Sequence, residues 1–335
     1  MDKNARILIA GAGSIGCFVG GVLAAAGRNV ALLGRGAIAA DVQREGLRIS
    51  DADGLNARLP PERAAMHVDP AILADAQVIF VTVKSGATED MASLIANHAP
   101  GAAIIVSLQN GVGHAERLRA ILPGHEVRAG MVPFNVIQPA PGHFRRATNG
   151  KIMIGKGPAK LDRLFDGSAL EVEERGDIDG VLWGKLLVNL NNAVNALSGV
   201  PLKQQLENRQ WRLVVARQLE EGLATLKAAG IEPKTAIPIP IKRMPTLLRL
   251  PNFLFTRMAK KTLNFDPEAR SSMADDFARG RTSEIEALQG AIIALAERHG
   301  VAVPVNRRVR DYVRAVEREG GGSPRLSPST LVPDL

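Results

Sequence analysis

The chain has 335 residues, of which 46% are hydrophobic and 23% charged, and its formal net charge is +8 at pH 7. These values are ordinary for a globular protein, and the length predicts two domains that each bury a core. The charge favours small anionic ligands over nucleic acid, since the sequence has one Tyr and no basic patch interleaved with aromatic residues. The lone Cys17 excludes an internal disulfide. With no signal-peptide pattern and no long uncharged apolar run, we expect a cytoplasmic protein without a membrane span.

The first predicted element is a buried strand over residues 7–10, and a glycine-rich loop follows it. The loop consists of Gly11, Ala12, Gly13, Ser14, Ile15 and Gly16. A helix over residues 14–26 and a second strand over 29–33 come next, and this order is typical of a dinucleotide site. Gly11 allows the tight turn, Gly13 lets the backbone approach a pyrophosphate, and Gly16 lets the helix pack closely on the strand. The helix N-terminus offers N–H groups to the phosphates.

The end of the second strand indicates which dinucleotide is bound. Sites for NAD place an acidic residue there, which holds the ribose 2′-hydroxyl. This chain has no acidic residue between Asp2 and Asp41, and Arg35 follows the strand instead. Because a guanidinium pairs well with a 2′-phosphate, we expect NADP(H); an exposed loop arginine without a ligand is the alternative.

Further buried strands are predicted over residues 75–84, 103–108 and 127–133, with helices over 88–98 and 115–122 between them. This alternation predicts a parallel sheet covered on both faces. Ligands of such sheets bind beyond the carboxyl ends of the strands, which places Lys84 and Asn110 beside the glycine loop and Arg35. A solvated strand-end lysine and an ordinary Asn-Gly turn are the alternatives.

The second half of the sequence is predicted to be almost entirely helical, over residues 178–197, 208–229, 267–279, 283–299 and 304–317. We therefore expect an α/β Rossmann domain with a mostly parallel sheet, followed by an all-helical C-terminal domain. The predicted ranges are 1–176 for the NADP-binding domain, 177–318 for the helical domain and 319–335 for a flexible tail rich in Gly, Pro and Ser.

The helix over residues 178–197 is apolar on most of its surface, which is typical of a buried helix. Lys185, Asn189 and Asn192 share one stripe of it, at spacings of four and three residues. Desolvation lowers the pKa of a lysine toward neutrality, so Lys185 is a candidate proton donor. The alternative is a stripe that faces solvent.

A second group of polar residues precedes the helix over 283–299. Ser283 and Glu286 have the spacing of a capping box, and Glu284 then lies in the first helical turn. On the residues alone, Glu284 is explained by a favourable interaction with the helix dipole.

Four separated motifs, taken together, resemble one enzyme family. They are Gly11-x-Gly13-x-x-Gly16, Gln109-Asn110-Gly111, Trp183-x-Lys185-Leu-x-Val-Asn189, and Ser271-Ser272-Met273 followed by Arg281-Thr-Ser-Glu284-Ile. Over residues 5–318 the chain resembles the ketopantoate reductase (2-dehydropantoate 2-reductase) family of pantothenate and CoA biosynthesis. The resemblance implies that NADPH delivers hydride to C2 of a 2-oxo acid, with no metal.

The resemblance also implies roles for individual residues. Lys185 polarises the carbonyl and donates a proton to the forming alkoxide, and Glu284 orients the substrate by a hydrogen bond. Ser272 binds the substrate carboxylate. The remaining contacts fall to Asn110, Asn189 and Asn192 on the substrate side, and to the glycine loop, Arg35, Lys84 and Asn110 on the cofactor side.

Two departures from the family pattern leave the substrate open. Ala193 stands where the family often has an Asn, and Lys203 falls near the position of a later one. A reductase of another 2-oxo acid and a non-catalytic NADP(H)-binding sensor therefore remain alternatives. The basic, acid-free stretch over residues 233–265 leaves three roles open, which are a lid, a contact of a homodimer and a surface for an anionic partner; an ordinary amphipathic connector is the alternative.

Overall fold

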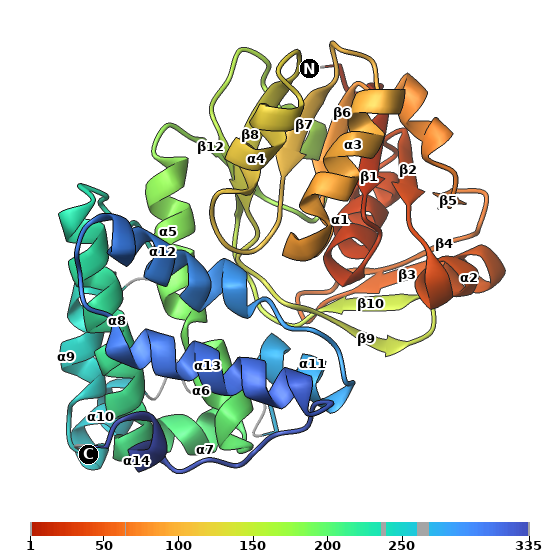
Figure 1. Cartoon of the computed structure of the whole chain (residues 1–335). Helices are drawn as coiled ribbons and strands as arrows, with labels where there is room; N and C mark the ends of the chain where they lie inside the picture. Colours follow the sequence, from red (N-terminus) through yellow and green to blue (C-terminus); the bar gives the residue numbers. More distant parts are fainter. Residues whose placement is uncertain (1, 64, 236–238, 260–267, 334–335) are drawn as a thin grey trace. The chain divides into compact units, whose positions relative to one another are not determined.

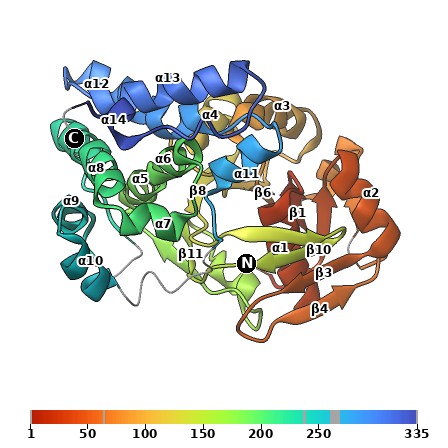
Figure 2. The same ribbon diagram turned by 90° about the horizontal axis from the view of Figure 1, so that it is seen from below.

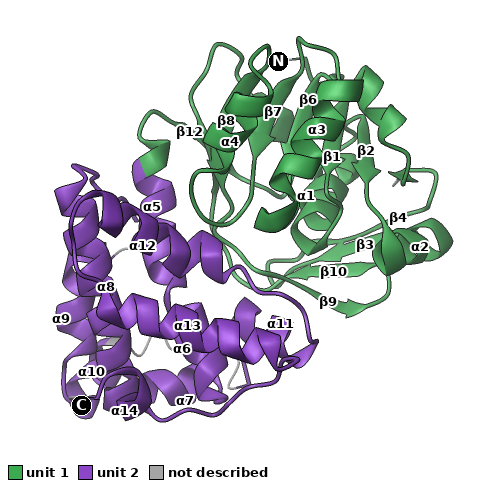
Figure 3. Ribbon diagram, in the orientation of Figure 1, with its two compact units in different colours: residues 1–179 green, residues 180–335 purple. Residues whose placement is uncertain are grey.

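The computed structural model describes residues 2–63, 65–235, 239–259 and 268–333. The chain divides into two compact units, Met1–Asp179 and Gly180–Leu335 (Figure 1, Figure 3). The first is an α/β unit. The described part of the second contains helices and no strands, which agrees with the predicted fold class.

The first unit is built on a sheet of eight strands among its described residues, in the order β12-β11-β8-β7-β6-β1-β2-β5. All neighbours run parallel except β8 and β11, which confirms the mostly parallel sheet. The central strands are short apolar runs that are buried on both faces. The bounds are β1 (Ile7–Ala10), β2 (Val30–Leu33), β5 (Met66–His67), β6 (Val78–Val81), β7 (Ile104–Ser107), β8 (Glu126–Met131), β11 (Ile152–Gly155) and β12 (Val172–Arg175).

A smaller sheet, with the order β4-β3-β10-β9, lies on the other side of helix α1 (Ser14–Ala25) (Figure 2). A Cβ at Gly20 would meet Ile9 and Leu32 of the large sheet, and one at Gly21 would meet Leu47 of the small sheet. Small residues therefore let α1 pack closely between both sheets. The small sheet contains β3 (Leu47–Ser50), β4 (Asn56–Leu59), β9 (Val136–Ala140) and β10 (His143–Arg146). The helices α2 (Gly36–Glu45), α3 (Thr88–His98) and α4 (His114–Ile121) complete the main elements of this unit.

The described part of the second unit consists of helices and the segments that connect them (Figure 2). Its predicted first helix is interrupted at Leu190 and forms two helices. The described helices are α5 (Ile178–Asn189), which begins just before the boundary, α6 (Asn191–Ser198), α7 (Leu202–Glu207), α8 (Arg209–Ala228), α9 (Met244–Leu248), α10 (Asn252–Ala259), α11 (Ser272–Ala278), α12 (Ala291–Arg298), α13 (Pro304–Arg318) and α14 (Pro328–Leu331).

The C-terminal segment, for which we expected a flexible tail, packs against its own unit. Ser323 Oγ donates a hydrogen bond to the Ala196 carbonyl at 2.7 Å, and Leu326 N–H donates to the Leu197 carbonyl at 2.9 Å. Leu331 is completely buried. The apolar residues that follow the Gly-, Pro- and Ser-rich stretch therefore hold the segment in place.

The described part of the basic stretch is attached to α8 by a buried arginine. The guanidinium of Arg212 donates to the carbonyls of Leu248 and Leu250, at 3.1 and 2.7 Å, and stacks over the ring of Phe255. Phe253 and Met258 of α10 remain 72% and 64% exposed. Lys260 and Lys261, which belong to the same basic stretch, lie outside the described residues.

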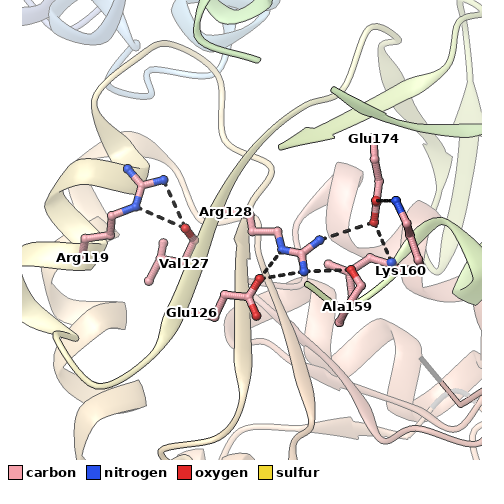
Figure 4. A network of polar contacts seen from close by, with 8 residues as sticks. Arg119, Glu126, Val127, Arg128, Ala159, Lys160 and Glu174 are labelled. Carbon is pink, nitrogen blue, oxygen red and sulfur yellow. Dashed lines mark hydrogen bonds and ion pairs between the residues drawn. The ribbon is translucent and has the colours of Figure 1, made fainter. Parts of the chain in front are cut away.

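The buried side chain of Arg128 on β8 is the centre of a network of charged residues that extends to the edge strand β12 (Figure 4). Its guanidinium donates to Glu126 at 2.7 Å, to the Ala159 carbonyl at 2.8 Å and to Glu174 of β12 at 3.4 Å. Burial raises the pKa of the Glu174 carboxyl. The hydrogen bond from Leu161 N–H and the charges of Lys160 and Arg128 outweigh that effect, so the pKa lies below its ordinary value.

We expect Glu174→Gln to lower the free energy of unfolding by about 2 kcal/mol at neutral pH, because it leaves the buried Arg128 with less opposing charge. The depressed pKa of Glu174 means that its contribution is complete above the unfolded-state pKa and is lost as the pH falls through the folded-state value. Urea unfolding of both proteins measures the difference, which should narrow in acid. The control is Glu171→Gln, since Glu171 and Lys151 form an exposed pair that contributes little. Equal losses in the two variants would contradict the burial argument.

Candidate functional site

The glycine loop joins β1 to α1 with the geometry that a phosphate-binding turn requires. Gly11 has a φ of 106°, and a Cβ there would lie 2.6 Å from the backbone nitrogen of Val83. A Cβ on Gly16 would lie 2.6 Å from the Gly11 carbonyl oxygen, so this glycine lets α1 approach β1. The first bond of the helix runs from Cys17 N–H to the Gly13 carbonyl at 2.8 Å. The N–H groups of the residues between Gly13 and Cys17 therefore have no acceptor inside the helix.

Gly13 differs from its neighbours because nothing in the described chain fills the space beside it. A Cβ built there has no heavy atom within 4 Å, and the backbone is extended, a conformation that any residue adopts. The glycine is therefore not needed for packing within the chain. It leaves open the approach to the helix N-terminus, which fits a pyrophosphate there.

Four adjacent strands place the predicted cofactor residues along one edge of the sheet. The order β7-β6-β1-β2 is parallel throughout, so the segments after these strands lie at the same edge. Arg35 follows β2 and precedes α2 with an exposed side chain, Lys84 follows β6, and Asn110 follows β7. The structure thus brings Gly13, Arg35, Lys84 and Asn110 to one edge of the first unit, at the topological position where doubly wound folds bind ligands.

A buried polar cluster that the sequence reasoning missed fastens the Asn110 loop. Gln109 Nε2 donates to Thr88 Oγ1 at 2.8 Å and to the Val83 carbonyl at 3.2 Å. His114 bonds through Nε2 to the Asn110 carbonyl at 2.8 Å. Burial, with the nearby Arg117, lowers the pKa of His114 to about 4, so the ring is neutral and donates this bond at pH 7. The signal in the sequence was that Gln109 and His114 flank the Asn110-Gly111 turn. This spacing alone does not indicate that the two side chains hold the loop.

In the second unit, Lys185 and Asn189 lie on α5 as predicted, and both side chains are half-buried. Leu186, Leu187 and Leu190 around them are completely buried. Burial lowers the pKa of Lys185 from its ordinary value to about 8. The amine is therefore close to its titration midpoint near neutral pH, which is the condition for efficient proton transfer.

Asn192 and Ser272 are 80 residues apart in sequence but lie together in the fold. Asn192 Nδ2 donates to Ser272 Oγ at 3.5 Å. Ser272 is exposed at the start of α11, and Asn192 is half-buried on α6. Its neighbour Ala193 is completely buried, whereas Lys203 lies half-buried on α7.

The segment around Glu284 differs from the predicted regular helix. Glu284 is half-buried just before a π-helical turn, η5 (Glu286–Gly290), and α12 begins only at Ala291. The expected capping box is wrong, because Ser283 N–H donates to the Glu317 carboxylate at 2.7 Å while Glu286 accepts from Arg314 at 2.6 Å. π-turns inside helices are frequent at functional sites.

The buried side chain of Gln289 in this turn reaches back to the interruption between α5 and α6. Its Nε2 donates to the Leu190 carbonyl at 2.9 Å and to Gln218 Oε1 at 3.0 Å. The π-turn is therefore attached to the helix interruption that separates Asn189 from Asn192. Periodicity does not reveal this contact, because both segments carry an ordinary helical pattern.

Two absences hold for the part of the chain that the structure describes. Within it, no cluster of three or more His, Cys, Asp or Glu side chains has an arrangement that could hold a metal ion. Its helices also include none with the length and apolar character needed to cross a bilayer.

The first unit has a mostly parallel sheet, and a glycine loop at the carboxyl ends of its strands leads into a helix. Together with the helical unit that follows, these features define a dinucleotide-binding protein of the Rossmann class. Comparison with known families agrees. Residues 7–159 match the model described as "Ketopantoate reductase PanE/ApbA", and residues 177–317 match the model of its C-terminal domain. The chain belongs to the ketopantoate reductase family, and as a member of it is an oxidoreductase.

Individual relatives span nearly the whole chain. A 2-dehydropantoate 2-reductase of Halobacterium salinarum is 31% identical over 94% of this chain and the whole of that protein. The crystal structure of a PanE/ApbA family ketopantoate reductase from Ralstonia eutropha JMP134 has a TM-score of 0.80 at 29% identity, and covers 94% of this chain and 99% of that one. The structure of D-mandelate dehydrogenase with NADH and anilino(oxo)acetate has a TM-score of 0.77 over 94% of this chain and 99% of that one; at 21% identity this shows a shared fold.

The open space beside Gly13 gives a test of the cofactor site. We expect Gly13→Ala to weaken NADPH binding at least about tenfold, because the methyl group occupies the approach to the helix N-terminus. The melting temperature should not change, since no described atom lies near the new methyl group. NADPH fluorescence titration and thermal melting measure the two quantities. Gly101→Ala, at another glycine with open space, is the control and should leave both unchanged. Unweakened binding in Gly13→Ala would contradict the proposed approach of the phosphates.

Proposed function

We propose that the protein reduces 2-dehydropantoate to pantoate with NADPH, with Lys185 as the proton donor. The observation that carries the proposal is the half-buried ammonium of Lys185, whose pKa is lowered to about 8 by burial. A protein that only binds a dinucleotide has no need for such a group. Family membership and relatives named 2-dehydropantoate 2-reductase support the choice of substrate.

Lys185 acts on the oxygen of the substrate carbonyl. As an ammonium it donates a hydrogen bond to that oxygen and polarises the C=O bond, so that C2 becomes a better hydride acceptor. When bound, the nicotinamide supplies the hydride. The alkoxide that forms is much more basic than an amine whose pKa is about 8, and Lys185 therefore transfers its proton to it. Release of a neutral amine next to buried leucines is favourable, because desolvation penalises the charged form.

The remaining predicted residues hold the substrate in this proposal. Ser272 Oγ and Asn192 Nδ2, 3.5 Å apart, offer a hydroxyl and an amide donor to the substrate carboxylate. Asn189, one helical turn after Lys185, lines the same stripe. Glu284 accepts a hydrogen bond from the substrate and fixes its orientation. Positioning of this kind lowers the barrier by holding the carbonyl still beside the donor.

The first unit holds the cofactor. The N–H groups at the start of α1 bind the pyrophosphate, and the exposed guanidinium of Arg35 pairs with the 2′-phosphate. Lys84 and Asn110 contact the cofactor from the segments after β6 and β7. Preference for NADPH over NADH then follows from Arg35, since no acidic residue follows the second strand before Asp41, where a site for NAD places one to bind the free 2′-hydroxyl.

One observation favours a second candidate, which is reduction of a different 2-oxo acid by the same chemistry. The buried Ala193 replaces an amide that the family often uses toward the substrate, and Lys203 adds a positive charge near another such position. A substrate with a more acidic or more apolar side chain would suit this pair. The proton donor and the carboxylate contacts are the same in both candidates.

We expect Lys185→Ala to lower turnover by about a hundredfold or more, because the variant lacks the polarising charge and the proton. NADPH binding should be retained, since the cofactor residues lie in the first unit. Steady-state NADPH oxidation and fluorescence titration test this expectation. Lys227→Ala, at an exposed lysine of α8, should behave as wild type in both assays. Wild-type turnover in Lys185→Ala would show that Lys185 is not the proton donor.

The pH dependence of reduction provides a separate test. The donor must be protonated, and its pKa is about 8, so turnover should be constant below that pH and fall about tenfold per pH unit above it. A pH–rate profile at saturating NADPH and 2-oxo acid measures the midpoint. A profile that stays flat well above pH 8 would show that another group supplies the proton.

A further inference from the structure

The two side chains proposed for the substrate carboxylate come from distant parts of the sequence. Asn192 belongs to α6 and Ser272 starts α11, and residues 260–267, which precede α11, lie outside the described part of the chain. α11 has only seven residues. Its place beside α6 is set by contacts with the rest of the second unit, which include a backbone hydrogen bond from Leu202 N–H to the Ala269 carbonyl at 2.9 Å and a group of side-chain hydrogen bonds.

Asn195, one turn after Asn192, makes the central contact. Its Oδ1 accepts a hydrogen bond from Ser271 N–H at 2.9 Å, and its Nδ2 donates to the Val200 carbonyl at 2.9 Å and to Gln205 Oε1 at 3.0 Å. Asn195 is 1% exposed, so these bonds form away from water, where losing any of them is costly. The side chain thus ties the residue before Ser272 to α6.

Backbone groups fix the orientation of this amide, and Gln205 of α7 is bonded to it. It is completely buried, and its Nε2 donates to Asn191 Oδ1 at 2.7 Å while its Oε1 accepts from Asn195. If the Asn195 amide turned over, its NH₂ group would face Ser271 N–H, and two donors would meet. The hydrogen bonds therefore allow one arrangement of the two amides, which is the condition for a rigid support.

Ser271 completes the connection to the substrate side. Its Oγ donates to the Asn192 carbonyl at 2.9 Å and accepts from Ala274 N–H at 3.2 Å as the N-cap of α11. Ser271 is buried, whereas the next residue, Ser272, is exposed with Asn192 Nδ2 at 3.5 Å. We infer that Asn195, held by its three hydrogen bonds, is a positioning residue that sets the distance between Asn192 and Ser272, and thereby the affinity for the substrate carboxylate. The inference rests on the proposed function.

The first test is Asn195→Leu, which keeps the number of side-chain heavy atoms and the branching at Cγ and removes all three hydrogen bonds. We expect the KM for the 2-oxo acid to rise about tenfold, with the NADPH dissociation constant unchanged. The pH–rate midpoint near 8 should also remain, because Lys185 is on a different helix. Ser271→Ala should also raise the KM. Ser271→Thr, which keeps the hydroxyl group, should have the wild-type KM.

The matched control is Asn306→Leu in α13. Asn306 is also a completely buried amide, and its Nδ2 donates to the Gln218 carbonyl at 3.2 Å and to the Glu221 carboxylate at 2.7 Å. We expect it to lower the melting temperature as much as Asn195→Leu does, with an unchanged KM. If Asn195→Leu, like Asn306→Leu, lowers the melting temperature and leaves KM unchanged, the inference is overturned, because Asn195 then only stabilises the fold.

Hydrogen–deuterium exchange separates this inference from the proposed function. In Asn195→Leu the peptide over residues 268–278 should exchange at least about tenfold faster, and α8 should exchange at the wild-type rate. If the wild type reduces no 2-oxo acid, the proposed function fails while exchange still tests the positioning. Wild-type exchange over 268–278 in the variant would overturn it. If Asn195→Leu does not fold, Ser271→Ala takes its place in both measurements, with the same expected results.

Discussion

The close approach of α1 to β1 at Gly16 is the constraint on which the cofactor side of the protein depends. No side chain fits between the helix and the Gly11 carbonyl, so the first turn of α1 lies directly over the edge of the sheet. The same helix is covered on its other side by the small sheet, which is why it consists of small and apolar residues throughout. A helix fixed on both sides keeps its N-terminal N–H groups in place, and a fixed array of donors binds a phosphate without an ordering cost.

The second unit contains a charged amine and several amides among apolar helices. Burial disfavours the charged form of Lys185 and lowers its pKa to about 8. A pKa near the working pH is the property that a proton donor needs. The amides are accommodated by bonding to one another, as in the pairs of Asn195 with Gln205 and of Gln289 with Gln218. Interruption of the predicted helix at Leu190 accompanies these contacts, since Gln289 donates to the Leu190 carbonyl. Polar groups in this unit therefore shape the backbone as well as the candidate site.

The sequence predicted most of the first unit because its signals are local. The apolar runs predicted as strands over residues 7–10, 29–33 and 75–84 contain β1, β2 and β6, each of four residues, and α3 has the predicted bounds, 88–98. The features that were not predicted depend on contacts across the fold. Ser283 and Glu286 have the spacing of a capping box, yet their partners are Glu317 and Arg314 of α13. The C-terminal segment has a disordered composition, yet Leu331 finds a place in the core. For the candidate site, the motifs identified Asn192 and Ser272, and only the structure shows Asn195 and Ser271 between them.

Reduction of 2-dehydropantoate is best tested by following the oxidation of NADPH by the wild-type protein, with a panel of other 2-oxo acids for comparison and NADH as the competing cofactor. We expect rapid oxidation of NADPH with 2-dehydropantoate and a slower reaction with NADH, since Arg35 has a 2′-phosphate to bind only in NADPH. Activity with a different 2-oxo acid alone would keep the chemistry and assign the specificity to Ala193 and Lys203. Tight NADPH binding without oxidation by any 2-oxo acid would contradict the account.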